Sequence, residues 1–381
     1  MRADPPGSAA PARAAGGLGE PAAALPVVLT AAAFYAAFTL TALALHGWNP
    51  LWFVWIGERY AFGDPRGHTG YDGQFVYYLA RDGWAGLRHL DNPPYRLQRI
   101  LYPALARALS GGNPTALPWV MVALNFLAIL TTTLLITRWL LAGGLSRWWG
   151  LAYPLFVGTL MSYSRDLTEP IAYALALAGV LAWLGERRTA ALGLLALATL
   201  ARESTVLFVV GLAIAELAGR RWWQVALLAA ACAPMLAWQL YLAAQLGALP
   251  VTRSAPLSLL PARGVFTALS AEPGRVSSFL FLGVPVLALT PVAVAAVWRA
   301  PRDPLAWFVA LHWAFVLIFP AAVQQHLLDA SRSAAGLLLA LLLAFPRSTR
   351  SLRLAVAACA TVPTVIWLAP MLWWAPWTAK M

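Results

Sequence analysis

The chain alternates between long apolar runs and short polar turns. Most of the runs approach the roughly 20 residues that a helix needs to cross a membrane. In hydrocarbon every backbone polar group must be paired, which an α-helix achieves internally. The pattern therefore predicts an all-α fold, a polytopic transmembrane helix bundle with about eleven spans. The predicted spans are 25–45, 116–137, 148–163, 169–185, 189–201, 204–218, 223–246, 277–298, 304–323, 333–346 and 354–375.

Residues 1–24 are rich in alanine, glycine and proline and show no hydrophobic period. This composition predicts a disordered tail. The first apolar run, 25–45, is longer than the roughly 7–15 residues of a secretory signal core, so we expect it to be retained as an anchor. The remainder, 25–381, is predicted to form a single transmembrane domain with a long polar connection at 46–115.

Residues 189–218 fit two interpretations. One long helix would bury Arg202 and Glu203 in its middle and leave ten spans, whereas two short helices would form a hairpin. A helix of about 13 residues rises about 20 Å, less than the roughly 30 Å of the hydrocarbon core, so the turn of a hairpin would lie below the membrane surface. We prefer the hairpin, which places both charges at membrane depth within protein.

The composition excludes most soluble classes of protein. Hydrophobic residues make up 61% of the chain and charged residues 11%, whereas about a quarter of an ordinary globular chain is charged. The net charge of +12 would suit nucleic acid, but the arginines are scattered in ones and twos between apolar runs. Because they do not gather on one face, we expect membrane lipids as partners and no nucleic acid.

The arginines also predict the orientation of the chain, because short cytoplasmic loops collect positive charge. With a cytoplasmic N-terminus, the arginine pairs at 187–188 and 220–221 lie in cytoplasmic loops, and these loops carry the larger excess of arginine over acid. The connection at 46–115 then lies on the extracytoplasmic side.

The connection at 46–115 is far longer than a turn between helices requires, which makes it the best candidate for an active region. Residues 70–75, at its centre, read Gly-Tyr-Asp-Gly-Gln-Phe. The carboxylate of Asp72 can approach a ligand closely because Gly73 has no side chain to obstruct it. The structural alternative is a turn, since Asp-Gly is a common turn dipeptide.

Two arginines, Arg96 and Arg99, lie where this connection returns to the membrane. An arginine there can form a forked pair with a phosphate at the level of the lipid headgroups. These two residues are therefore candidates to bind a phosphate, and anchoring to anionic headgroups is the alternative.

Two charged turns lie on the same predicted side of the membrane. One contains Arg165, Asp166 and Glu169, and the other contains Arg202 and Glu203. Ionisable groups at membrane depth are costly and usually face the interior of a bundle, so the two turns predict a shared cavity. The alternatives are structural: Arg202 could pair with Glu203, and Glu169 suits the first turn of a helix.

With these features in place, the chain resembles the GT-C glycosyltransferases, which transfer sugars from polyprenyl-phosphate donors. The resemblance rests on one anchor, a long outer loop with an aspartate, and many spans. More narrowly, the segments at 70–75, 96–103 and 166–170 resemble a set of bacterial membrane proteins associated with the formation of cell-surface glycopolymers. This resemblance implies that the protein lies in the bacterial inner (plasma) membrane and that its active site is extracytoplasmic.

The resemblance implies an inverting transfer to a cell-envelope glycan or lipid acceptor, with Asp72 as the catalytic base. A divalent metal, Mg²⁺ or Mn²⁺, is a possible cofactor, although the nearest acids, Asp64 and Asp82, are eight and ten residues away from Asp72. The residues predicted to bind the donor phosphate are Arg96, Arg99, Arg165 and Arg202. The residues predicted to contact the sugar or the acceptor are Tyr71, Gln74, Asp166, Glu169, Glu203 and Gln325.

Two other classes of function compete with a transferase. A polytopic transporter or lipid-carrier flippase would be favoured by charged cavities at both faces of the membrane, but the sequence shows no internal repeat and no mid-span charges on both sides. A non-catalytic subunit of an envelope-polysaccharide assembly complex would differ from an enzyme only in activity.

Overall fold

The computed structural model describes residues 18–253, 257–258, 260–264, 266, 273–324 and 326–373. Of the described residues 78% are helical and none lies in a strand, which confirms the all-α prediction. Of the predicted tail, only residues 18–24 are described. The first helix, α2 (Pro21–Leu45), begins before the predicted start of the first span at Leu25.

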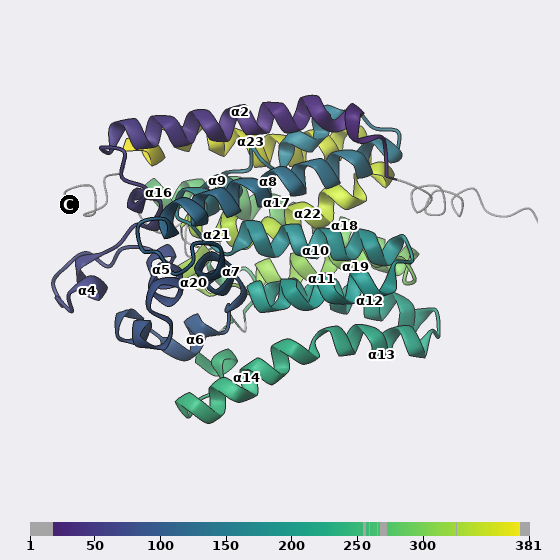
Figure 1. Ribbon diagram of the computed structural model, residues 1–381. Coiled ribbons are helices and arrows are strands. Elements are labelled where there is room, and N and C mark those ends of the chain that lie inside the picture. The colour runs from purple at the N-terminus through teal and green to yellow at the C-terminus, as the bar shows by residue number, and fades with distance from the viewer. Residues whose placement is uncertain are drawn as a thin grey trace, which may run out of the picture.

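The helices pack side by side into one bundle (Figure 1). α22 (Ala335–Ala344) lies inside it, is buried along almost its whole length, and contacts α8, α10 and α19. A helix that is apolar on all sides suits a position surrounded by protein. The other helices of the bundle are α2, α8 (Leu117–Ala142), α9 (Val157–Ser164), α10 (Glu169–Leu184), α11 (Arg188–Ala201), α12 (Val206–Ala218), α13 (Trp222–Ala231), α14 (Ala233–Leu246), α16 (Pro273–Ser278), α17 (Val284–Ala288), α18 (Thr290–Arg299), α19 (Pro304–Leu317), α20 (Ala321–Gln324), α21 (Leu327–Ser333) and α23 (Arg350–Trp373).

Fewer helices have spanning length than the sequence predicted. Among the described residues, four helices are long and apolar enough to cross a membrane, or up to six if each bent pair is one span. The bent pairs are α13 with α14, at 41°, and α21 with the helix that follows it, at 51°. The predicted span at 148–163 is instead a 3₁₀ turn followed by the eight-residue α9. Pro154, which has no backbone N–H to donate, lies in the break.

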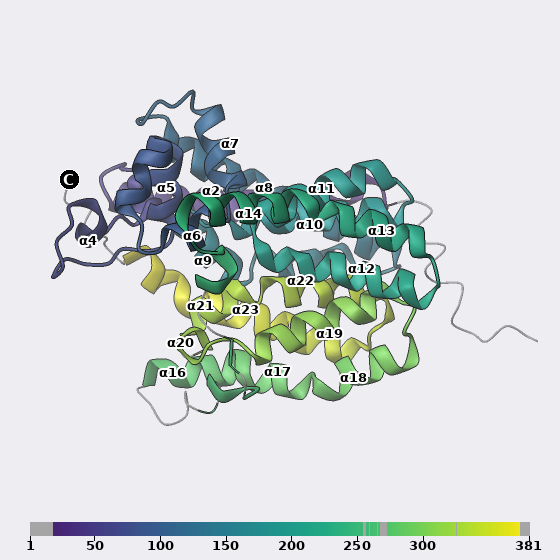
Figure 2. The ribbon, with the colours of Figure 1, turned by 90° about the horizontal axis from the view of Figure 1, so that it is seen from below.

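Large apolar side chains are exposed on the outer helices of the bundle. Examples are Leu29 on α2, Trp223 on α13, Trp298 on α18 and Val365 on α23. Figure 1 shows α2 and α13 at opposite edges, and Figure 2 shows α18 along a further edge. Exposed apolar surface on this scale is unusual in a soluble monomer, so these helices indicate a membrane-embedded protein.

The connection at 46–115 folds into short helices that gather at one end of the bundle (Figure 1). Near the end of the connection lies α7 (Leu101–Leu109), whose Tyr102 and Ala106 are buried against α8. The connection is therefore a folded cap on the bundle. Its other elements are α3 (Leu51–Val54), α4 (Glu58–Ala61), α5 (Gly73–Asp82), η1 (Gly83–His89) and α6 (Pro93–Leu97).

Residues 189–218 form two helices, as the preferred interpretation expected. α11 ends at Ala201, and α12 begins at Val206 after a 3₁₀ turn. Arg188 at the start of α11 and Arg221 beyond the end of α12 line the same pocket. The chain therefore runs out along α11 and back along α12, with Arg202 at the turn.

Gly73, the first residue of α5, brings the cap against the turn between α9 and α10. A Cβ atom at Gly73 would lie 2.0 Å from the carbonyl oxygen of Arg165 and 3.1 Å from that of Val54. Both neighbours are backbone atoms, which cannot rotate away as a side chain can. Gly73 is thus required for the contact between cap and bundle, whereas the sequence suggested that it leaves room for a ligand.

Replacing Gly73 with alanine is expected to destabilise the protein by about 1–3 kcal/mol, because the added methyl group overpacks this contact. Thermal unfolding in detergent, followed by tryptophan fluorescence, measures the change. Gly193→Ala in α11 is the matched control, since nothing lies within 4 Å of its Cβ position. Equal unfolding temperatures for the two variants would contradict the close approach.

Candidate functional site

Asp72 lies immediately before α5 and is held between two arginines. Its Oδ1 is 3.1 Å from Nη2 of Arg96, and its Oδ2 accepts a hydrogen bond of 2.8 Å from Nη2 of Arg332. Arg96 comes from α6 of the cap and Arg332 from α21 of the bundle. Asp72 therefore joins the cap to the bundle through charge.

Arg332 is the centre of a larger network of charges. Its Nη1 donates to Oε1 of Glu169 at 3.1 Å, and its Nε lies 3.5 Å from Oδ1 of Asp329. The hydroxyl of Tyr71 donates to Asp329, and the guanidinium carbon of Arg332 lies 5.2 Å from the centre of the Tyr71 ring. One arginine therefore contacts three carboxylates and an aromatic ring.

The two charged turns meet, as the sequence predicted. Nη1 of Arg202 lies 3.0 Å from Oε1 of Glu169, so the turn before α12 contacts the turn before α10. Glu203 does not pair with Arg202, and that interpretation is wrong. Its carboxylate accepts two hydrogen bonds from Arg99 of the cap, at 2.5 and 2.9 Å. Adjacent residues of one turn thus contact different elements.

A small cavity of about 20 Å³ lies within this network, and its charged lining residues are Asp72, Arg96, Arg99, Glu169 and Arg332. Arg202 and Glu203 do not line it. A cavity of this size has room for about one water molecule. The arginines are occupied by carboxylates in this closed arrangement. A phosphate or a sugar can enter only if some of these ion pairs separate.

The charges around Asp72 control its protonation. Burial raises the pKa of Asp72, but Arg96, Arg332 and Arg99 lower it by more, so the pKa lies well below its usual range. Asp72 is therefore ionised at neutral pH. Held by two arginines, it is also a weak base, because basicity falls with pKa.

Other predicted site residues lie outside this cluster. Arg165 is buried with its guanidinium carbon 3.9 Å from the ring centre of Trp55 and 5.1 Å from that of Trp52, and it does not line the cavity. Asp166 is also buried, and one of its oxygens lies 3.3 Å from Nδ2 of Asn125. The structure therefore separates these two residues from Glu169 of the same turn.

Gln74, another predicted site residue, forms hydrogen bonds to the backbone of the cap. Its Oε1 accepts from the backbone N–H of Gly57 at 3.0 Å, and its Nε2 donates to the carbonyl of Thr69 at 2.7 Å. These bonds hold the 57–70 loop against α5, away from the cavity. Gln325 lies outside the described residues.

Sequence reasoning missed Arg332 and Asp329 as parts of the site. They are three residues apart on α21, in an otherwise apolar stretch that ends with α22. Charged residues in such a stretch usually face a bundle interior, and this signal could have identified them.

The donor set around Asp72 does not suit a divalent metal. Both carboxylate oxygens face arginines, and a cation bound there would be repelled by them. Within the part of the chain that the structure describes, no three His, Cys, Asp or Glu side chains form a group that could hold a metal ion. The residues present instead suit an anion, because arginine binds phosphate through a fork of N–H donors.

The pair of Glu203 and Arg99 makes a testable contribution to stability. Burial raises the pKa of Glu203, but Arg99 lowers it by more, to about 2 from the ordinary 4.5. A carboxyl group whose pKa is lower in the folded than in the unfolded protein stabilises the fold at pH values above its unfolded pKa. This stability is lost as the pH falls toward the folded pKa.

We expect Glu203→Gln to unfold at a lower temperature than the wild type at neutral pH. The difference should shrink as the pH falls from about 4.5 toward about 2, where the wild-type carboxylate is also neutral. Unfolding scans across this range measure it. A difference that did not change with pH would contradict an ionic role for Glu203.

Comparisons with known proteins do not assign the chain to a family. No family model, no curated protein and no solved structure matches it. Inference about function therefore depends on the residues of the chain itself.

Proposed function

We propose that this protein is an integral-membrane glycosyltransferase of the GT-C type. It transfers a sugar from a polyprenyl-phosphate donor to a cell-envelope glycan or lipid acceptor, on the extracytoplasmic face of a bacterial inner membrane. The supporting observation is that Asp72 lies between Arg96 and Arg332, beside a cavity lined also by Arg99 and Glu169. A carboxylate beside three arginines supports a proton acceptor next to a phosphate-binding site.

In this proposal the 3₁₀ turn with α9, and the helices α10, α11, α12 and α19, also cross the membrane. With the four long helices and the two bent pairs they give eleven spans. α10, α11 and α19 are apolar helices of 14–16 residues, somewhat shorter than the hydrocarbon core requires. Their polar ends would then form a funnel below the extracytoplasmic surface, beneath the cap that contains Asp72. The N-terminus lies in the cytoplasm.

The proposed reaction is a single displacement at the anomeric carbon. The oxygen of the acceptor hydroxyl bonds to this carbon, the bond from the carbon to the phosphate oxygen breaks, and the polyprenyl phosphate leaves with the electron pair. Asp72 accepts the proton of the hydroxyl, and the configuration inverts. Arg96, Arg99 and Arg332 stabilise the charge on the leaving phosphate.

Binding of the donor would also activate Asp72. A donor phosphate that takes over Arg96 and Arg332 removes the two groups that lower the pKa of Asp72 most. The pKa then rises toward its ordinary value, so Asp72 becomes a stronger base when the donor is in place. The closed ion pairs would thus restrain the base until the substrate arrives.

A transfer assay tests this function. The purified protein in lipid nanodiscs is incubated with polyprenyl phosphates that carry radiolabelled hexoses or pentoses, together with a delipidated cell-envelope glycan or an envelope lipid extract. Label should move into the acceptor and release the polyprenyl phosphate. If no donor in this panel is bound or consumed, the proposal is wrong.

One observation favours a lipid-carrier flippase as a second candidate: a charged pocket lies at each end of the bundle. The first contains Asp72 and the second contains Arg188, Arg221 and Arg302. Proteoliposomes with a labelled lipid-linked sugar in one leaflet separate the two functions. A flippase would move the intact lipid to the other leaflet, whereas a transferase would split it.

A further inference from the structure

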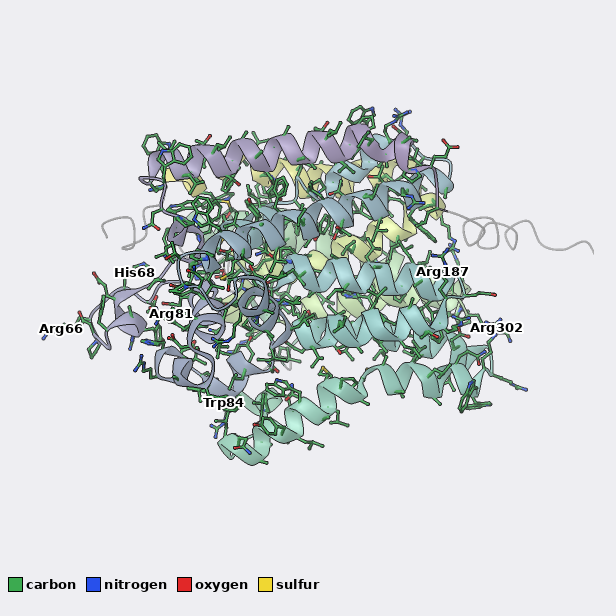
Figure 3. All side chains as sticks on the ribbon, in the orientation of Figure 1. Arg66, His68, Arg81, Trp84, Arg187 and Arg302 are labelled. Atoms are coloured by element: carbon green, nitrogen blue, oxygen red, sulfur yellow. The ribbon has the colours of Figure 1, made fainter. Side chains whose placement is uncertain are left out.

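The second charged pocket lies at the end of the bundle opposite the cap. Figure 3 places Arg187 and Arg302 at this end and Arg66 and Arg81 at the other. The pocket has a volume of about 230 Å³ and lies between the ends of α10 and α12 and the start of α19. It shares no lining residue with the cavity at Asp72.

Positive charge dominates its wall. Arg188, Arg221 and Arg302 line the pocket together with two acids, Glu186 and Glu216. Arg188 is the first residue of α11, Arg221 precedes α13 and Arg302 precedes α19, so three separate segments contribute an arginine to one pocket. A pocket with this excess of arginine is suited to an anion.

Two of the arginines are fixed by carbonyl groups at helix ends. Nη1 of Arg188 donates to the carbonyl of Trp183 at 2.8 Å, and its guanidinium carbon lies 4.0 Å from the Trp183 ring centre. Nε of Arg302 donates to the carbonyl of Ala218 at 3.2 Å. Each of these bonds uses one of the five N–H groups of a guanidinium. Capping of helix ends therefore orients the two arginines without exhausting their donors.

One of the two acids in the pocket, Glu216, already accepts hydrogen bonds from the protein. Glu216 is buried, its Oε1 accepts from Nε1 of Trp183 at 3.0 Å, and its Oε2 accepts from Nη1 of Arg221 at 3.2 Å. Both carboxylate oxygens are thus directed at protein donors. Glu216 fixes the wall and leaves Arg188 and Arg302 to face an incoming anion.

The surroundings place the pocket at the level of lipid headgroups. Trp222 and Trp223 begin α13, directly after Arg221, and both are strongly exposed. Exposed tryptophan beside arginine at the end of apolar helices is typical of a membrane interface. At about 230 Å³ the pocket is slightly smaller than the roughly 300–1,000 Å³ of sites for drug-sized ligands.

We propose that this pocket binds a phosphate group, with Arg188 and Arg302 as its principal donors. The phosphate can belong to an anionic lipid headgroup or to a soluble ion, and both would use the same contacts. This site is independent of the proposed transfer reaction at Asp72.

Two binding arms identify the source of the phosphate. In the first, delipidated protein in detergent is titrated with phosphatidylglycerol and followed by native mass spectrometry, with phosphatidylcholine for comparison. In the second, the same protein is titrated with inorganic phosphate by calorimetry. Saturable binding of phosphatidylglycerol assigns a lipid, and saturable binding of inorganic phosphate alone assigns a soluble anion. No saturable binding in either arm would overturn the proposal.

Variants test the assignment of residues. The double variant Arg188→Gln/Arg302→Gln should weaken binding by at least about tenfold, since it removes two charge-assisted contacts. Glu186→Gln, at an exposed residue of the rim, should strengthen it about twofold to threefold by removing a repelling charge. Arg350→Gln is the matched control, an exposed arginine that does not line the pocket.

The Glu186→Gln variant keeps the test decisive if the double variant folds poorly. Loss of an acid at an exposed rim leaves the helix caps intact, so a tighter complex could arise only from the charge of the pocket. Unchanged binding in both variants, or equal weakening in Arg350→Gln and the double variant, would show that the anion binds elsewhere.

Discussion

Replacing Asp72 with asparagine is expected to reduce sugar transfer by about 10²- to 10⁴-fold, the usual contribution of a general base. Asparagine has nearly the same shape but cannot accept the proton of the acceptor hydroxyl. The fold should survive, because Arg332 keeps Glu169 and Arg96 keeps Asp91 as partners. The initial rate of label transfer in nanodiscs measures the effect.

Asp82→Asn is the matched control for this variant. Asp82 ends the same helix, α5, and is also paired with an arginine, Arg81 at 2.7 Å. It does not line the cavity, so its loss should leave transfer within about twofold of the wild type. A rate for Asp72→Asn that matched the control, with donor binding intact, would remove Asp72 from the chemistry.

Features of the site within one local segment could be predicted from the sequence. The length of the 46–115 connection made it the candidate active region, and Asp72 and Arg96 both fall in it. They meet because α5 and α6 pack against each other within the cap. The charged turns were predictable for a similar reason, since α10 and α11 are successive antiparallel helices with polar ends.

The position of Arg332 could not be predicted in this way. It is separated from Asp72 by 260 residues and reaches it because α21 packs against α9, beneath the cap. Such packing depends on how the whole bundle assembles, which periodicity along the chain does not encode.

The direction of each side chain within a charged turn also could not be predicted from the sequence. Arg165, Asp166 and Glu169 occupy one turn, yet only Glu169 faces the cavity. Asp166 has a backbone φ of +46°, in the left-handed region, which redirects the chain between its neighbours. Three charged residues in a short segment therefore reach three separate environments.

Replacing Arg332 with glutamine is expected to lower the free energy of unfolding by about 3–5 kcal/mol, the usual effect of removing one partner of a buried ion pair. Its side chain is 14% exposed and contacts Asp72, Glu169 and Asp329, so the substitution leaves several carboxylates with less positive charge. Reversible unfolding in mixed detergent micelles measures the loss. The control Arg81→Gln breaks a more exposed pair and should cost less than about 1 kcal/mol.

A second substitution distinguishes lost charge from lost packing. If Arg332→Gln destabilises by leaving Asp72 with Arg96 as its remaining ion-pair partner, then adding Asp72→Asn should restore part of the stability, because the incompletely neutralised charge is also removed. The double variant should therefore be more stable than Arg332→Gln alone, with a coupling energy of about 0.5–3 kcal/mol between the two positions. Additive losses in this cycle would mean that Arg332 stabilises the bundle through contacts other than Asp72. Among the described residues, the ion pair between cap and bundle that would then remain is that of Arg99 with Glu203.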